Sequence, residues 1–207
     1  MAQDIGGIAG IILAAGMSRR PGPDLLLIPI DGVPLIRRSI DRAMYGGVAP
    51  IVVVTGPDPR PYVDVTIGSV GKFEPLANPD ASMSDALHAG LEWVPAANVA
   101  AVVLLPEMVH VTSEMIRAVV DRHRATEAPL VASRYGKVPA PPFLIARTLF
   151  AEFLEWSGDG WGEPVVHRHR RKAEWLDWPA DAAAEVRTAE DLAAFMADRR
   201  GTPDSDR

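Results

Sequence analysis

The stretch "IAGIILAAGMSRRPGPDLLL", residues 8–27, determines the fold class of this chain. Residues 8–15 form a continuous apolar run, which is typical of a strand covered on both faces of a parallel sheet. The following loop offers a hydroxyl at Ser18 and guanidinium groups at Arg19 and Arg20, and its glycines allow a ligand to approach the backbone closely. We interpret this loop as a phosphate-binding loop; a plain connection with two solvated arginines is the alternative interpretation.

Strands and helices are expected to alternate along the rest of the chain. Apolar runs predict strands, and apolar residues at helical spacing predict helices, of which two have a threonine near the start as a candidate cap. The expected strands cover residues 8–15, 51–56, 99–106, 130–133 and 142–145, and the expected helices cover residues 34–47, 84–94, 112–125, 147–156 and a last segment after Thr188.

This alternation predicts an α/β fold: a three-layer sandwich with right-handed strand-helix-strand units around a mostly parallel sheet. Ligands of such sheets bind beyond the carboxyl ends of the strands. The loops after Ala15, Gly56 and Leu105 are therefore expected to form the binding site.

Composition excludes several classes of function. The 207 residues fit a single domain, residues 1–207, with a core from about 7 to 198 and frayed ends. A formal charge of -6 argues against nucleic acid and anionic membranes as partners, and the absence of cysteine excludes disulfides and thiolate metal sites. Because no apolar run nears 18 residues and no leader pattern is present, we expect a soluble cytoplasmic protein.

Several segments, taken in order, resemble the motifs of the MobA/MocA-like nucleotidyltransferases. "LAAGMSRRPGPDLLLIPIDGVPLI" (13–36) resembles the family signature L-A-A-G-x-S-x-R-M-G-x-x-K-L-L-L followed by G-x-P-L-L. Further matches are "VVVTG" (52–56), "NPDASMSDALHAGL" (78–91), "VVLLPEMVHVT" (102–112), "GDGWGEPVVHRH" (158–169) and "VRTAEDLAAF" (186–195). The resemblance therefore covers nearly the whole chain.

The resemblance implies a Rossmann-like fold of the nucleotide-diphospho-sugar transferase type. It also implies a reaction in which a phosphate of molybdopterin attacks the α-phosphorus of CTP or GTP, with Mg²⁺ as cofactor and pyrophosphate as leaving group. Carried over by motif, the catalytic residues are Arg19, Arg20 and Glu107, and the metal ligands are Glu107 and Asp159. The nucleotide-binding residues are Leu13, Ala14, Ala15, Gly16, Ser18, Gly22, Thr55, Gly56, Asn78, Met83 and Ser84.

Charged positions of the motifs differ from the family pattern. The sign of the charge is inverted at Asp24, where the signature has lysine, at Glu163, where it has arginine, and at Arg187, where it has aspartate. The aspartate expected to bind metal is replaced by Glu107, and Glu185 replaces the other aspartate of the closing motif. A carboxylate in place of a cation beside a triphosphate is unfavourable by several kcal/mol at contact distance.

Three functions follow from these observations. The chain is an active nucleotidyltransferase, or it is a non-catalytic relative that binds a cofactor, a metabolite or a molybdenum enzyme as an accessory protein. An oxidoreductase that binds a dinucleotide is the weakest hypothesis, because "GMSRRPG" is not G-x-G-x-x-G and the second strand ends in Thr55-Gly56 rather than in an acidic ribose ligand. We interpret the basic run "HRHRRK" (167–172) as a solvated helix face. Trp161 lies in the segment "GDGWGEPVVHRH" (158–169), at a position where the family motif has glycine.

Overall fold

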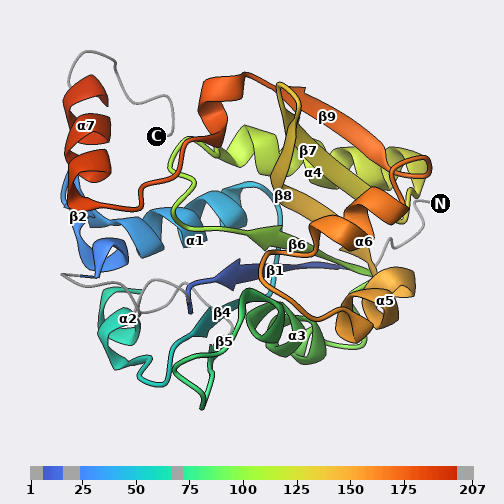
Figure 1. The fold of residues 1–207 in the computed structure, drawn as a ribbon, viewed down its shortest axis with the longest axis horizontal. Coiled ribbons are helices and arrows are strands. Elements are labelled where there is room, and N and C mark those ends of the chain that lie inside the picture. Colours follow the sequence, from blue (N-terminus) through green and yellow to red (C-terminus); the bar gives the residue numbers. More distant parts are fainter. Residues whose placement is uncertain (1–6, 16–23, 67–71, 200–207) are drawn as a thin grey trace.

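The computed structural model describes residues 7–15, 24–66 and 72–199. Within them, a seven-stranded sheet has the order β5-β4-β1-β6-β8-β7-β9, and a short hairpin forms a second sheet (Figure 1). The hairpin pairs β2 (Pro29–Ile30) with β3 (Val33–Pro34). The mostly parallel α/β fold predicted from the sequence is confirmed.

The centre of the sheet consists of parallel strands that are buried along their whole length. These are β1 (Ile8–Leu13), β4 (Ile51–Thr55) and β6 (Ala100–Leu104). β1 pairs with both others in parallel, so the carboxyl ends of the three strands lie at the same edge of the sheet. Because both faces are covered by helices, a continuous apolar run is the pattern that these strands require.

The outer strands follow less regular patterns. β8 (Val138–Ala146) runs antiparallel between β6 and β7 (Leu130–Tyr135). The two edges are formed by β5 (Lys72–Pro75), parallel to β4, and β9 (Glu174–Trp178), parallel to β7. Neither edge strand was predicted, because half-buried edge strands carry polar residues that interrupt an apolar run.

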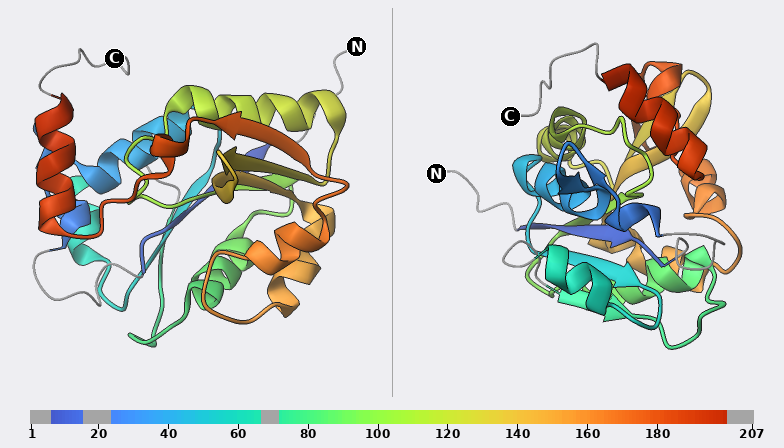
Figure 2. Two further views of the ribbon diagram at one scale, coloured as in Figure 1. Left: turned by 45° about the horizontal axis from the view of Figure 1, so that its top comes forward. Right: turned by 90° about the vertical axis from the view of Figure 1, so that its left-hand side faces the viewer.

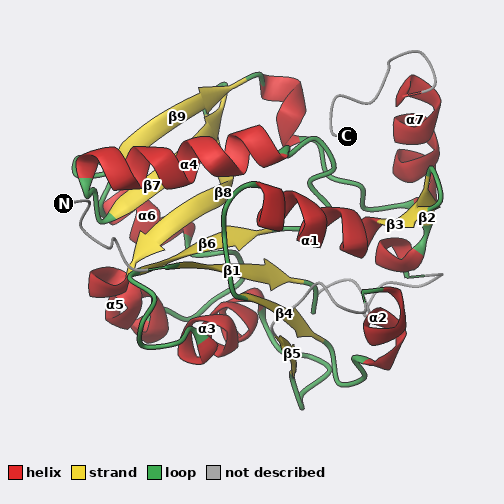
Figure 3. Cartoon of the chain, turned by 180° about the vertical axis from the view of Figure 1, so that it is seen from behind, coloured by secondary structure: helices red, strands yellow, loops and turns green. Residues whose placement is uncertain are grey.

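Helices cover both faces of the sheet, which confirms the three-layer sandwich. α1 (Leu35–Tyr45) and α4 (Ser113–Thr126) lie on one face, whereas α3 (Met83–Trp93), α5 (Phe150–Glu155) and α6 (Glu163–Arg168) lie on the other (Figures 2 and 3). The remaining helical segments are α2 (Arg60–Val65), α7 (Ala189–Arg199) and the 3₁₀ turns η2 (Leu25–Leu27), η3 (Arg147–Leu149) and η4 (Ala180–Ala183).

Side-chain caps begin α4 and α7 where the sequence predicted them. Thr112 Oγ1 accepts the N–H of Met115 at the start of α4. Thr188 Oγ1 accepts the N–H of Asp191, and a carboxylate oxygen of Asp191 accepts the N–H of Thr188. Among the described residues no helix is long and apolar enough to span a bilayer.

Candidate functional site

A pocket lies at the carboxyl ends of the parallel strands β1 and β6. Its empty volume is about 320 Å³. The end of β1, the segment before α3, the first turn of α3 and the segment after β6 contribute its lining: Leu13, Ala15, Ala81, Ser82, Met83, Ala86 and Glu107. This is the place at which open parallel sheets bind their ligands.

Glu107 supplies the acidic group of this pocket. It follows β6 directly and only 6% of its surface is exposed. Its backbone carbonyl accepts the N–H of Val109 at 3.0 Å and that of Val186, from the segment before α7, at 2.9 Å. The loop around Glu107 is therefore held by its own turn and by the C-terminal part of the chain.

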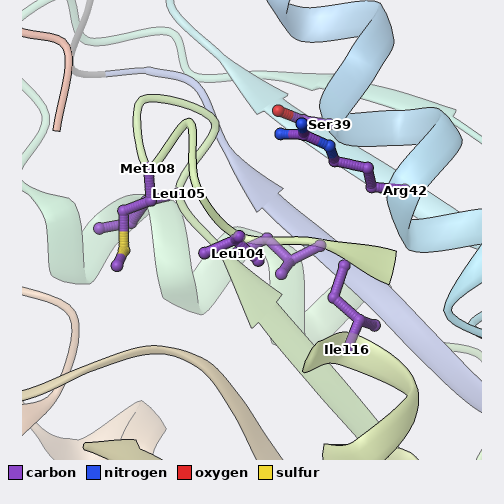
Figure 4. Close-up of a pocket in the computed structure, with 7 residues that line it drawn as sticks. Ser39, Arg42, Leu104, Leu105, Met108 and Ile116 are labelled. Atoms are coloured by element: carbon purple, nitrogen blue, oxygen red, sulfur yellow. The ribbon is translucent and has the colours of Figure 1, made fainter. Parts of the chain in front are cut away.

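Helix α1 holds the same loop from the other face of the sheet. Arg42 Nη1 donates to the carbonyl of Val109 at 2.9 Å, and Ser39 Oγ donates to that of Pro106 at 3.5 Å. Ser39, Arg42, Leu104, Leu105, Met108, Val111 and Ile116 line a second pocket there, of about 230 Å³ (Figure 4). Since its two polar side chains bind the Glu107 loop, we assign this region a supporting role.

Arg187 directly follows Val186, whose backbone N–H binds the carbonyl of Glu107. Its Nε donates to Glu185 Oε2 at 2.7 Å. The pKa of the Arg187 guanidinium is raised, first by this hydrogen bond and by the charge of Glu185, and then by the charges of Glu107 and Asp191. The motif position that has aspartate in the family pattern thus carries a cation that interacts with Glu107.

The first turn of α3 forms the opposite wall of the pocket. Ser82 Oγ accepts the N–H of Asp85 at 3.1 Å, and Asp85 Oδ2 accepts the N–H of Ser82 at 2.7 Å, which completes a capping box. The Ser82 hydroxyl also donates to Asp85 Oδ2 at 2.8 Å, and this hydrogen bond, followed by the one from the Ser82 N–H, holds the pKa of the exposed Asp85 carboxyl below its usual value. This wall therefore presents an exposed carboxylate where the family motif has serine.

Helix α3 also holds the loop that carries Asp159. Ser84 Oγ accepts the N–H of Gly158 at 3.2 Å, and His88 Nε2 lies 2.9 Å and 2.8 Å from the carbonyl oxygens of Phe153 and Trp156. The motif segment that begins at Gly158 is thereby anchored next to the first turn of α3.

The Gly158 segment itself carries two exposed carboxylates, Asp159 and Glu163. A Cβ atom on Gly160 would lie 2.5 Å from Glu163 Oε2, so the carboxylate of Glu163 folds over this glycine. Trp161, in contrast, is 7% exposed, with its ring 4.8 Å from that of Phe143. Trp161 is therefore a core residue.

The donor set fits a divalent metal that arrives with a nucleotide. Across the part of the chain that the structure describes, no three His, Cys, Asp or Glu side chains gather into a metal site. Mg²⁺ is commonly held by one or two carboxylates together with substrate phosphates, and a buried carboxylate at a strand end suits this arrangement. Glu107 supplies such a carboxylate, although the charge of Arg187 opposes binding of a cation there.

The structure brings several of the predicted site residues together. Leu13, Ala15, Met83 and Glu107 line the pocket, and Ser84 follows Met83 in the same helical turn. Gly16, Ser18, Arg19, Arg20 and Gly22 lie outside the described residues, so their assignment as the phosphate-binding loop stays a prediction.

Other predicted residues make local backbone contacts. The N–H of Ala14 donates to the carbonyl of Val54, and Thr55 Oγ1 donates to the carbonyl of Gly56 at 2.8 Å. Asn78 Oδ1 accepts the N–H of Asp80 in the turn before Ala81. Their roles in nucleotide binding stay predictions, because none of them lines the described pocket.

Sequence reasoning did not identify Ala81, Ser82 and Ala86 as pocket residues. A signal for Ser82 was present, since serine followed three residues later by Asp85 is a capping pattern that places a helix start at this point.

The basic run 167–172 is only partly helical, because α6 ends at Arg168. Arg168 and His169 both contact the carboxylate of Glu152.

Asp24 has structural contacts that its place in the motif did not predict. Its Oδ1 accepts the N–H of Leu26 at 3.0 Å and caps η2, while Oδ2 accepts a hydrogen bond from the hydroxyl of Tyr62 in α2. Tyr62 is 2% exposed, and its burial and the Asp24 carboxylate both raise the pKa of the phenol. Asp24 therefore joins the segment after the predicted phosphate loop to α2.

We expect Asp24→Ala to lower the free energy of unfolding by about 1–3 kcal/mol, because it removes a cap and leaves the buried Tyr62 hydroxyl without its acceptor. Tyr62→Phe should have a smaller effect, because water can still reach the half-buried carboxylate. Urea unfolding of both variants and of the double variant measures the coupling. Additive effects of the two changes would contradict a direct interaction.

Solved structures share this fold. The crystal structure of Rv0371c from Mycobacterium tuberculosis H37Rv superposes with a TM-score of 0.79 at 22% identity, over 93% of this chain and 99% of that chain. A complex of Rv0371c with manganese has a TM-score of 0.74, over 93% of this chain and 98% of that one. At this identity the likeness establishes the fold.

Two curated relatives are similar in sequence. A molybdenum cofactor guanylyltransferase from Rhodobacter capsulatus is 33% identical over 136 residues, 63% of this chain and 64% of the relative. A probable molybdenum cofactor guanylyltransferase from Opitutus terrae is 30% identical over 97 residues, 45% of this chain and 48% of the relative. The matches thus span about half to just under two thirds of these relatives.

A family match covers most of the chain. The pattern of the MobA-like NTP transferase domain matches residues 10–174, which include most of β1 and all of β4, β6 and α3, together with Glu107. The chain belongs to the family of MobA-like NTP transferase domains.

Proposed function

We propose that this protein transfers a nucleotidyl group from CTP or GTP to a molybdopterin-type acceptor, with Mg²⁺ bound together with the nucleotide. The observation that carries the proposal is Glu107, a carboxylate that is 6% exposed and lines a pocket with the end of β1 and the first turn of α3. The membership in the MobA-like family supports it.

In the proposed reaction an acceptor phosphate oxygen attacks the α-phosphorus, the bond between the α-phosphorus and the bridging oxygen breaks, and pyrophosphate leaves. The metal would be held by Glu107 and Asp159 and would neutralise charge on the phosphates. The chain positions the reactants: α3 and the Glu107 loop form two walls of the pocket, and Arg19 and Arg20 are proposed to bind phosphate.

A direct test is the release of pyrophosphate from CTP or GTP in the presence of Mg²⁺ and molybdopterin. We expect release that matches the amount of nucleotidylated acceptor formed and that stops when EDTA is added. A reaction without acceptor serves as the control. A folded sample that releases no pyrophosphate from any of the common nucleoside triphosphates would contradict the proposal.

A second candidate function is a non-catalytic binding protein, for example an accessory factor of a molybdenum enzyme. The charges favour it: the charges of Arg187 and Glu107 interact, and Asp85 adds an exposed carboxylate to the turn of α3 that lines the pocket. Calorimetric titration separates the two functions. Binding of nucleotide or molybdopterin without pyrophosphate release would support the accessory role.

A further inference from the structure

The segment before α7 contacts the Glu107 loop through its backbone, and it carries a charged side chain next to this contact. The N–H of Val186 donates to the carbonyl of Glu107 at 2.9 Å, and the next residue is Arg187. Arg187 Nε is bound to Glu185 Oε2 at 2.7 Å, and the arginine side chain is 63% exposed. Arg187 therefore directly follows the residue whose backbone binds the Glu107 loop, and its guanidinium group is held by Glu185.

This arrangement changes the charge of the wall. The motifs that this chain resembles have aspartate at positions 107, 185 and 187, whereas this chain has two carboxylates and one guanidinium. Glu185 is also hydrogen-bonded to Arg187, so it is less available to a metal ion. Arginine stays charged at every pH at which the protein is folded, and its planar fork suits phosphate oxygens.

We propose that Arg187 is a binding residue of the nucleotide pocket, which supplies a permanent positive charge beside Glu107, disfavours free divalent metal and attracts the phosphates of a nucleotide directly. This inference rests on the proposed nucleotide site, and it adds to that site a residue of this chain whose charge opposes free metal and favours phosphate. The opposed charges at positions 107 and 187 give the physical reason.

Mn²⁺ binding to the nucleotide-free protein, followed by electron paramagnetic resonance, tests the proposal without an activity assay. We expect weak binding to the wild type and roughly tenfold tighter binding to Arg187→Asp, because a repulsive charge becomes a carboxylate ligand. Arg187→Lys keeps the charge and should bind as weakly as the wild type.

Arg134→Asp is the matched control. The side chain of Arg134 is 41% exposed, and its Nε donates to Asp177 at 2.6 Å on the β7–β9 edge of the sheet. The variant changes the net charge of the protein by the same amount as Arg187→Asp. We expect it to leave Mn²⁺ affinity within about twofold of the wild type, since distant exposed charges are screened by salt.

A second measurement follows the nucleotide in EDTA. Arg187→Asp and Arg187→Gln should bind CTP and GTP more weakly than the wild type, with the larger loss, roughly tenfold, for Arg187→Asp. Because the side chain is largely exposed, this difference should shrink at high salt. Thermal melts of the lysine and glutamine variants establish that the compared samples are folded.

The outcomes separate this inference from the proposed function. Equal Mn²⁺ affinities of Arg187→Asp and Arg134→Asp would overturn the role of Arg187, whatever the wild type does with nucleotides. A wild type that binds no nucleotide but gains Mn²⁺ affinity in Arg187→Asp would refute nucleotidyl transfer and still support a repulsive charge at the Glu107 wall.

Discussion

Glu107→Gln is expected to reduce the rate of pyrophosphate release roughly 10²- to 10³-fold, if the protein is a nucleotidyltransferase. The substitution keeps the size of the side chain and one acceptor oxygen, but it removes the charge and replaces the other oxygen with an NH₂ group. Glu107 lines the pocket and is only 6% exposed. Water therefore has little access to the position of the carboxylate and cannot take over its role in balancing the charge of a bound metal ion. The expected loss is mainly in kcat, measured with saturating Mg²⁺ and acceptor.

The control for this experiment is Glu92→Gln. Glu92 is exposed and lies near the end of α3, whereas the first turn of that helix lines the pocket. This variant makes the same chemical change and should keep wild-type activity. Glu107→Asp restores the residue of the family motif and should keep measurable activity; if it were as inactive as Glu107→Gln, the carboxylate alone would not explain the loss.

Gly90→Val is expected to lower the free energy of unfolding by about 3 kcal/mol or more, the largest effect on stability that we expect. Gly90 lies where α3 packs against β1. A Cβ atom at this position would lie 2.4 Å from Ile11 Cγ2 and 3.4 Å from Val54 Cγ2, and both neighbours are fully buried. Since α3 forms a wall of the pocket, the variant should also lose nucleotide binding.

Glu92→Val is the matched control for Gly90→Val. It places the same β-branched side chain in the same helix at an exposed position, where the cost is helix propensity alone, about 0.5 kcal/mol. A double-variant cycle of Gly90→Ala with Ile11→Ala then tests the contact itself. The added methyl should partly fill the cavity left at Ile11, so strictly additive effects would contradict the packing argument.

The central strands were predictable because burial on both faces produces a pattern that is visible in the local sequence. β1, β4 and β6 are buried on both faces, so every position in them must be apolar, and such runs are visible without knowledge of their neighbours. The edge strands β5 and β9 were not predictable in this way. Their residues are half-buried or exposed, and polar side chains at an edge conceal the strand pattern.

The candidate site was predictable in part. Glu107, Leu13, Ala15 and Met83 follow from motifs, and they meet because parallel strands bring their carboxyl ends to one edge. The contact between Asp24 and Tyr62 was not predictable, because the two residues are 38 positions apart and the segment that contains Tyr62 shows no apolar period.

The sequence by itself determined that this chain is an α/β sandwich of the MobA-like family. Apolar runs and motif order carry this information, since burial constrains each residue locally. Only the tertiary structure decided what the charged motif residues contact: Asp24 binds the Tyr62 hydroxyl, and Arg187 binds Glu185 next to the backbone contact of Val186 with Glu107. The physical reason is that electrostatic and hydrogen-bond energies depend on distance in space, which long-range packing determines.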